Sequence, residues 1–258
     1  MMTIQPGLRV LVTAGASGIG WAIALALLKE GARVHLCDAS PEQLDFALRE
    51  KPEIGGSVAD VSNVQQVERL FHDVRHSFGG LDVLVNNAGI AGPTGAVEDI
   101  APEDWSRTLA VNITGQFLCA RLAVPMLKAA GGGAIINMSS VAGRLGYALR
   151  TPYAASKWAV IGFTESLAIE LGPHNIRVNA LLPGVVRGER IRRVIAERAK
   201  LQGVPYEEME GQYLNQVSLR RMVTAEDVAA MALFLCSPAG SNISGQSLGV
   251  CGNVEVLR

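Results

Sequence analysis

Tyr153 and Lys157 are the residues whose types and spacing point most directly to chemistry. Side chains four residues apart on a helix project from the same face, one turn from each other. A free phenol has a pKa of about 10 and is a poor base at neutral pH, but a neighbouring ammonium stabilises the phenolate. The pair could therefore exchange a proton with a substrate. A tyrosine and a lysine at this spacing also occur by chance on solvated helices, so the pair alone leaves the function open.

Two predicted elements could place a dinucleotide beside this pair. A β-branched run at residues 9–12 precedes a glycine-rich stretch, 13–20, and an apolar helical segment follows. In such a turn the backbone can approach a pyrophosphate, which the helix N-terminus also attracts. A second strand ends at Asp38, where a carboxylate would bind the adenosine ribose and repel a 2′-phosphate. This arrangement favours NAD over NADP. The alternative is an acid that only caps a strand end.

Predicted strands and helices alternate along the rest of the chain. The alternation predicts an α/β fold with a Rossmann-type, doubly wound, mostly parallel sheet and helices on both faces. Since no linker or repeat is visible, we expect residues 1–258 to form a single catalytic domain that binds the dinucleotide. Further strands are predicted at 81–85, 134–138, 176–181 and 248–250, and helices at 64–78, 103–128 (interrupted near Asn112 and by Pro125), 153–171 and 224–236.

Composition argues against several other classes of protein. With 49% apolar residues, 18% charged residues and a net charge of −1, the chain offers no electrostatic basis for binding nucleic acid or an anionic membrane. Its four cysteines are scattered, which argues against a metal site or a disulfide framework. We see no signal peptide at residues 1–8 and no apolar run near the ~18 residues of a membrane span. We therefore expect a soluble, cytoplasmic protein.

The motifs, taken in order, resemble those of the short-chain dehydrogenase/reductase family over essentially the whole chain. A glycine-rich loop alone is weak evidence, but this many pieces at these spacings, with Ser140 thirteen residues before Tyr153, form a specific pattern. The matching residues are Thr13 to Gly20, Asp60 and Val61, Asn86 to Gly89, Asn112, Ser139 and Ser140, Tyr153 with Lys157, and Pro183 with Gly184.

The resemblance implies a role for each catalytic residue. Tyr153 would be the general acid/base, assisted by Lys157, which also holds the nicotinamide ribose. Ser140 would donate a hydrogen bond to the substrate oxygen, and Asn112 would disrupt its helix and hold a water that connects Lys157 to solvent. Ser139 would be structural, and no metal is expected. The implied cofactor-binding residues are Gly15, Ser17, Gly18, Ile19, Asp38, Asp60, Val61, Asn87, Tyr153, Lys157 and Val186.

Three positions depart from the family pattern. Ala14 stands where the first glycine of the loop is usual, and we expect the turn to tolerate it at negative φ. Gly188 stands where a threonine often contacts the nicotinamide amide, and residues 250–253 replace a usual Val-Asp-Gly-Gly. None of these changes touches the proton-transfer residues.

Residues 187–216 follow Pro183 and Gly184 and are the expected substrate lid. One of the cations on the lid or beside the catalytic residues could hold a carboxylate or another anion. The alternative is a solvated helix face on which Glu189 pairs with Arg193 at four-residue spacing. The candidate cations are Arg144, Arg150, Arg187, Arg190, Arg192, Arg193, Arg198 and Lys200.

The sequence thus predicts an NAD-dependent oxidoreductase that acts on a small secondary alcohol or its ketone, with Tyr153 as acid/base. One alternative is an NADPH-dependent 3-oxoacyl-carrier-protein reductase, which Asp38 disfavours. Another is a dinucleotide-sensing binding protein without catalysis, which the complete set of catalytic residues argues against. The substrate, the direction of reaction and its stereochemistry stay open.

The helix predicted at residues 153–171 is apolar on nearly every side, more than one sheet contact can cover. The family's paired helices imply that Trp158 and Phe163 pack against another subunit, in a homodimer or homotetramer. The alternative is a helix fully enclosed within one chain.

Overall fold

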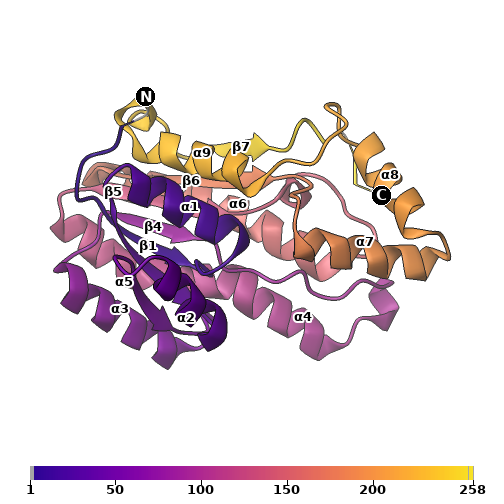
Figure 1. Ribbon diagram of the computed structural model, residues 1–258, viewed down its shortest axis with the longest axis horizontal. Helices are drawn as coiled ribbons and strands as arrows, with labels where there is room; N and C mark the ends of the chain where they lie inside the picture. The colour runs from indigo at the N-terminus through magenta and orange to yellow at the C-terminus, as the bar shows by residue number, and fades with distance from the viewer. Residues whose placement is uncertain (1–2, 255, 258) are drawn as a thin grey trace.

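A seven-stranded sheet forms the centre of the computed structural model, which describes residues 3–254 and 256–257 (Figure 1). Its strands are β1 (Arg9–Thr13), β2 (Arg33–Asp38), β3 (Gly55–Val58), β4 (Val83–Asn86), β5 (Gly133–Met138), β6 (Ile176–Pro183) and β7 (Ser247–Val250). Their order is β3-β2-β1-β4-β5-β6-β7, and every pairing is parallel. The strand order reverses between β1 and β4, which places a ligand crevice at their carboxyl ends. The predicted Rossmann-type sheet is confirmed, and in the described residues it is wholly parallel.

Helices cover both faces of the sheet, with one apolar core on each side. The helices are α1 (Gly18–Lys29), α2 (Pro41–Glu50), α3 (Val64–Phe78), α4 (Pro102–Leu109), α5 (Gly115–Ala129), α6 (Thr151–Leu171), α7 (Glu189–Gln202), α8 (Tyr206–Asn215) and α9 (Ala225–Cys236). One core lies beneath α1, α2 and α9, and the second beneath α3, α5 and α6. A third, smaller cluster joins α7 and α8 to the loops after β5 and β6, and Figure 1 shows these two helices together at one end of the molecule.

The helix that carries the Tyr–Lys pair begins two residues earlier than predicted. It starts at Thr151, with Pro152 in its first turn, where a proline's missing N–H costs nothing. Tyr153 therefore lies in the first turn, near the carboxyl edge of the sheet, and Lys157 lies in the second. The helix after residue 224 is confirmed, with Thr224 and Asp227 forming a capping box.

The interruption predicted near Asn112 is a π-helical turn, Ala110–Thr114, between α4 and α5. Pro125, by contrast, lies inside α5 without ending it. Because the π-turn keeps the helix continuous, Pro102–Ala129 forms one run of 28 residues, which is long and apolar enough to span a membrane by length and composition alone. The sequence was expected to contain no apolar run near the length of a membrane span, and this run corrects that expectation. Half of its most apolar window is buried in the protein, as expected for a core helix, and α5 packs against α3, β4 and β5.

Large apolar side chains remain exposed on α4, α5 and α6. Trp158 is 52% and Ile169 82% exposed on α6, while Phe163 is partly buried. Trp105 on α4 and Phe117 on α5 are also exposed, and α4 packs directly against α6. The chain therefore does not enclose α6 fully, contrary to the alternative considered from sequence.

Candidate active site

Tyr153 and Lys157 lie next to each other at the carboxyl edge of the sheet. The Lys157 Nζ is 5.6 Å from the centroid of the Tyr153 ring and donates a hydrogen bond of 2.9 Å to the Met138 carbonyl at the end of β5. Lys157 is only 3% exposed. Burial, with a smaller contribution from the positive charge of Arg190, lowers the pKa of Lys157 to about 7. The ammonium that the sequence predicts beside Tyr153 therefore has a pKa close to neutral pH.

Ser139 and Ser140 follow β5 and face α6 in different ways. The Ser139 hydroxyl donates to the Lys157 carbonyl at 2.8 Å and so fixes α6 against the sheet. The Ser140 hydroxyl accepts from the Ala142 N–H at 3.2 Å, and its own contact with the Pro183 carbonyl is long, at 3.5 Å. A hydroxyl held this loosely as a donor can turn toward another acceptor. Ser140 thus lies at the site with its donor hydrogen available.

Asn112 is fully buried in the π-turn and joins three parts of the site. Its amide nitrogen donates to the Ile90 carbonyl and to the Ser156 hydroxyl, both at 3.0 Å. Its amide oxygen accepts from the Ile90 N–H at 2.7 Å. These bonds hold the segment after β4 against α6. The predicted relay through a water stays a prediction.

The glycine-rich turn fits a dinucleotide pyrophosphate. Ser17 caps α1 in an extended conformation without a side-chain hydrogen bond, which leaves the N–H groups of the first turn available. A Cβ added to Gly18, at φ 54, would meet nothing within 4 Å, so the space above the loop is open. A Cβ on Gly20 would collide with the Ala14 carbonyl and the Asn87 amide, because α1 packs closely beneath the loop.

Ala14 corrects one expectation. Its φ is 47°, in the left-handed region, rather than negative as the sequence analysis expected. The Asn87 amide donates to the carbonyls of Thr13 and Ala14, both at 3.0 Å, and so fixes the turn. An alanine in this conformation costs about 1 kcal/mol.

Asp38 lies at the end of β2 with its carboxylate turned toward the glycine-rich loop. It accepts from the Ser40 N–H at 3.1 Å, so it caps the end of β2, as the alternative from sequence supposed, and it also accepts from the Ala16 N–H of the loop at 3.2 Å. A recess beside it is lined by an acid, Glu42, and contains no lysine or arginine among the described residues. The recess is lined by Ala16, Ser17, Gly18, Trp21, Glu42, Gln43 and Phe46.

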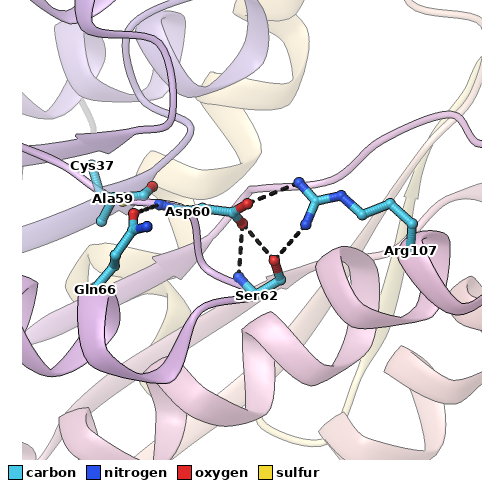
Figure 2. A network of polar contacts seen from close by, with 6 residues as sticks. All are labelled: Cys37, Ala59, Asp60, Ser62, Gln66 and Arg107. Atoms are coloured by element: carbon cyan, nitrogen blue, oxygen red, sulfur yellow. Dashed lines mark hydrogen bonds and ion pairs between the residues drawn. The ribbon is translucent and has the colours of Figure 1, made fainter.

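Asp60 is held in a polar network that Figure 2 shows. One carboxylate oxygen accepts from the Ser62 N–H and hydroxyl, and the other accepts from Arg107 at 2.8 Å. Burial acts to raise the pKa of this carboxyl, but the bonds from Ser62 and Arg107 outweigh it, and the pKa is lowered. The Asp60 N–H donates to Gln66 at 2.8 Å. Asp60 thus ties the loop after β3 to α4.

The remaining predicted cofactor residues occupy the same edge. Gly15 packs beneath the loop, where an added Cβ would meet Leu36 at 2.7 Å. Val61 is buried in the core beneath α3 and α5, so its backbone rather than its side chain is available to a ligand. Ile19 and Val186 are partly buried against the opposite core.

Arg150 is a second cation beside Tyr153. Its guanidinium carbon lies 5.4 Å from the Tyr153 ring centroid, and the side chain is only 2% exposed. Its terminal nitrogens donate to the Thr94 hydroxyl and the Ala91 carbonyl. The sequence analysis named Arg150 only as a possible anion ligand. Its position over the ring depends on tertiary packing, for which the sequence carries no local signal.

The lid residues form two helices, α7 and α8, that contact the site. Arg190 donates to the Gly89 carbonyl at 2.7 Å, and Arg198 is buried over the Tyr147 ring. Glu189 pairs with Arg192, three residues on, at 2.8 Å rather than with Arg193 as predicted. Either spacing places the partners on one helix face, and here the i,i+3 pair forms.

The parallel sheet, the glycine-rich turn and the Tyr–Lys pair together define a Rossmann-type oxidoreductase that uses a dinucleotide. A family model described as enoyl-(acyl carrier protein) reductase matches residues 13–253. Sorbitol dehydrogenase from Cereibacter sphaeroides is 38% identical, covering 95% of this chain and 96% of that protein. The chain belongs to the short-chain dehydrogenase/reductase family, whose members are oxidoreductases that bind a nicotinamide dinucleotide.

Two solved structures show how closely the fold matches. NAD+-bound xylitol dehydrogenase gives a TM-score of 0.92 at 32% identity, covering 96% of this chain and 99% of that one. A variant of actinorhodin polyketide ketoreductase with NADPH gives 0.93 at 35% identity, covering 98% and 99%. One neighbour carries NAD+ and the other NADPH, so the fold alone does not choose between the two cofactors.

Proposed function

We propose that this protein is an NAD-dependent oxidoreductase that transfers a hydride between a small secondary alcohol, or its ketone, and nicotinamide. The observation that carries the proposal is the position of Lys157 and Arg150 beside the Tyr153 ring, with the Lys157 Nζ 5.6 Å and the Arg150 guanidinium carbon 5.4 Å from its centroid. A phenol beside these two basic side chains is placed to exchange a proton with a substrate. Sorbitol and xylitol dehydrogenases among the similar proteins support an alcohol as substrate.

In the oxidation direction, the Tyr153 phenolate accepts the hydroxyl proton of the alcohol. The loosely held Ser140 hydroxyl donates to the same substrate oxygen and stabilises the charge that develops on it. When bound, the nicotinamide would supply the hydride acceptor for the carbinol carbon, which would become the ketone carbon. Lys157 would hold the nicotinamide ribose, and the proton would leave Tyr153 along the groups around Asn112. In reduction, the phenol of Tyr153 returns the proton.

The choice of NAD rests on the end of β2. The Asp38 carboxylate, with Glu42 in the neighbouring recess, places negative charge where a 2′-phosphate would lie, and no cation among the described residues lines that recess. We therefore expect kcat/KM for NAD to exceed that for NADP at least tenfold. A preference for NADP would favour the alternative, an NADPH-dependent 3-oxoacyl-carrier-protein reductase. The ketoreductase neighbour, whose structure contains NADPH, supports this alternative.

The test is turnover of sugar acids, hydroxy acids, polyols and cyclic alcohols with NAD, by wild type and by Tyr153→Phe. We expect the variant to lose 10²–10⁴-fold in kcat while it still binds NADH, as followed by nucleotide fluorescence. Intact oxidation rates in the variant would refute the mechanism. Binding of NADH without turnover of any compound by wild type would instead support a dinucleotide-sensing protein.

We also propose that a second copy of the chain covers the exposed apolar face of α4, α5 and α6, in a homodimer or homotetramer. Four large apolar side chains on these helices expose 38–82% of their surface, which is unusual for side chains of this size. They are Trp105, Phe117, Trp158 and Ile169.

A further inference from the structure

The cations of the lid (residues 187–216) and of the catalytic loop between β5 and α6 (residues 139–150) have different roles in the structure. Arg150 and Arg198 are buried and bind backbone or hydroxyl groups, and Arg144 donates to the Ser247 carbonyl. Arg192 pairs with Glu189. These four are held by their own contacts.

Arg190 differs from these four, because it reaches from α7 to a carbonyl beside Asn112 and Lys157. It lies in the first turn of α7 and donates through Nη2 to the Gly89 carbonyl, 101 residues away in sequence. A Cβ added to Gly89 would lie 3.2 Å from the Asn112 amide oxygen and 3.4 Å from the Lys157 Nζ. Arg190 therefore binds the carbonyl of a residue, Gly89, that lies next to the side chains of Asn112 and Lys157.

The charge of Arg190 is not balanced. Within the described residues it forms no ion pair, and the adjacent acid, Glu189, is bound to Arg192. Its positive charge contributes to the lowered pKa of Lys157, so the two cations repel each other at the site. One guanidinium nitrogen binds Gly89, and the remaining donors of an exposed side chain are available to a ligand.

We propose that Arg190 determines substrate specificity by binding a carboxylate of the substrate, so that the preferred substrates are hydroxy acids and their oxo acids. The inference rests on the proposed oxidoreductase function and names its substrate class. A planar guanidinium binds a carboxylate through two parallel hydrogen bonds, which fixes the orientation as well as the position of the substrate. An anion here also relieves the repulsion between Arg190 and Lys157.

The test compares 2- and 3-hydroxy acids with their methyl esters in wild type, Arg190→Ala and Arg193→Ala. Arg193 is the matched control, because it is exposed on the same helix and forms no hydrogen bond or ion pair in the described chain. We expect Arg190→Ala to lose about 30-fold or more in kcat/KM on the best acid and threefold or less on its ester. Arg193→Ala should match wild type on both, and Arg190→Lys should recover part of the loss.

NADH titrations of the same variants show whether Arg190 binds a carboxylate of the substrate or a phosphate of the cofactor. The proposal expects Arg190→Ala to bind NADH within twofold of wild type. Equal losses on acid and ester, or weakened NADH binding that accounts for both, would overturn it. Wild-type turnover of esters with no preference for acids would also overturn it while leaving the oxidoreductase function intact.

If wild type turns over nothing, the proposed function fails, and calorimetry still decides the inference. Oxo acids and their methyl esters are then titrated into the protein–NADH complex. Binding of the acids that Arg190→Ala abolishes supports the carboxylate site, and no difference between acid and ester removes it.

Discussion

Lys157 connects catalysis to the pH dependence of stability. Its pKa is about 7 in the folded protein, because the side chain is buried, and about 10.4 in the unfolded chain. Between these values the unfolded chain binds a proton that the folded chain does not, so the free energy of unfolding rises with pH. The gain from this residue between pH 7 and pH 10 is about 3 kcal/mol.

We predict that Lys157→Met removes most of this gain. Urea unfolding gives the change in the free energy of unfolding between pH 7 and pH 10 for wild type and for the variant. The difference between these two changes isolates Lys157, because the other titrating groups contribute equally to both. Parallel pH dependence in the two proteins would show that Lys157 stays charged in the folded state.

We predict that replacing Ala14 stabilises the folded protein, because its backbone has a positive φ. Replacing it with glycine removes the cost of about 1 kcal/mol for an alanine at φ 47, partly offset by the greater freedom of glycine in the unfolded chain. Ala14→Gly should therefore raise the free energy of unfolding by up to about 1 kcal/mol, as seen in thermal and urea melts. Ala26→Gly, inside α1, is the control and should destabilise by a similar amount. A destabilised Ala14→Gly would show that the turn is not strained.

The roles of single residues could be predicted from the sequence, but the burial and the neighbours of those residues could not. The spacing of Tyr153 and Lys157 places them on one face of a helix regardless of the rest of the chain. The burial that lowers the pKa of Lys157 and the position of Arg150 over Tyr153 depend on segments distant in sequence. The left-handed turn at Ala14 was missed because an alanine disfavours positive φ, although the glycine that is usual at this position pointed to it.

At the scale of elements, Tyr147 is one of the residues that join the lid to the catalytic loop. The hydroxyl of Tyr147 hydrogen-bonds that of Tyr213 on α8 at 2.6 Å. The guanidinium carbons of Arg150 and Arg198 lie 5.7 Å and 5.5 Å from the Tyr147 ring centroid. Burial raises the pKa of Tyr147, so its hydroxyl stays protonated.

We predict that Tyr147→Phe and Tyr213→Phe each cost about 1–3 kcal/mol, because each leaves the other hydroxyl buried without its partner. The double variant should cost less than the sum of the two singles. Urea unfolding of the four proteins measures the coupling, and hydrogen exchange at α8 shows whether the lid opens locally. Strict additivity would mean that the two hydroxyls do not stabilise the lid.

Elements with strong apolar periodicity were predicted correctly, and those that depend on neighbours were not. The helix Val64–Phe78 matches its predicted bounds, since its apolar residues recur at helical spacing. β3 was not predicted, because Gly55-Gly56-Ser57-Val58 has low strand propensity and forms a strand by pairing with β2. α2, which follows Asp38, was also not predicted, although Ser40 and Pro41 are typical of a helix start.

At the scale of the whole molecule, the exposed face of α4, α5 and α6 predicts self-association. In a twofold interface the same patch is buried on both subunits, so a single substitution acts twice. Burying a large apolar side chain contributes about 1.5–3 kcal/mol. A charge at Trp158 should therefore weaken the dimer by at least about 100-fold in Kd.

Sedimentation velocity over a wide concentration range measures this effect. We expect wild type to sediment as a dimer or tetramer, and Trp158→Glu and Ile169→Glu to dissociate toward monomer while keeping the native circular dichroism spectrum. Leu201→Glu is the control, because Leu201 is 54% exposed, like Trp158, but lies on α7. A wild-type monomer at every concentration would refute the association, and equal dissociation by Leu201→Glu would place the interface on the lid instead.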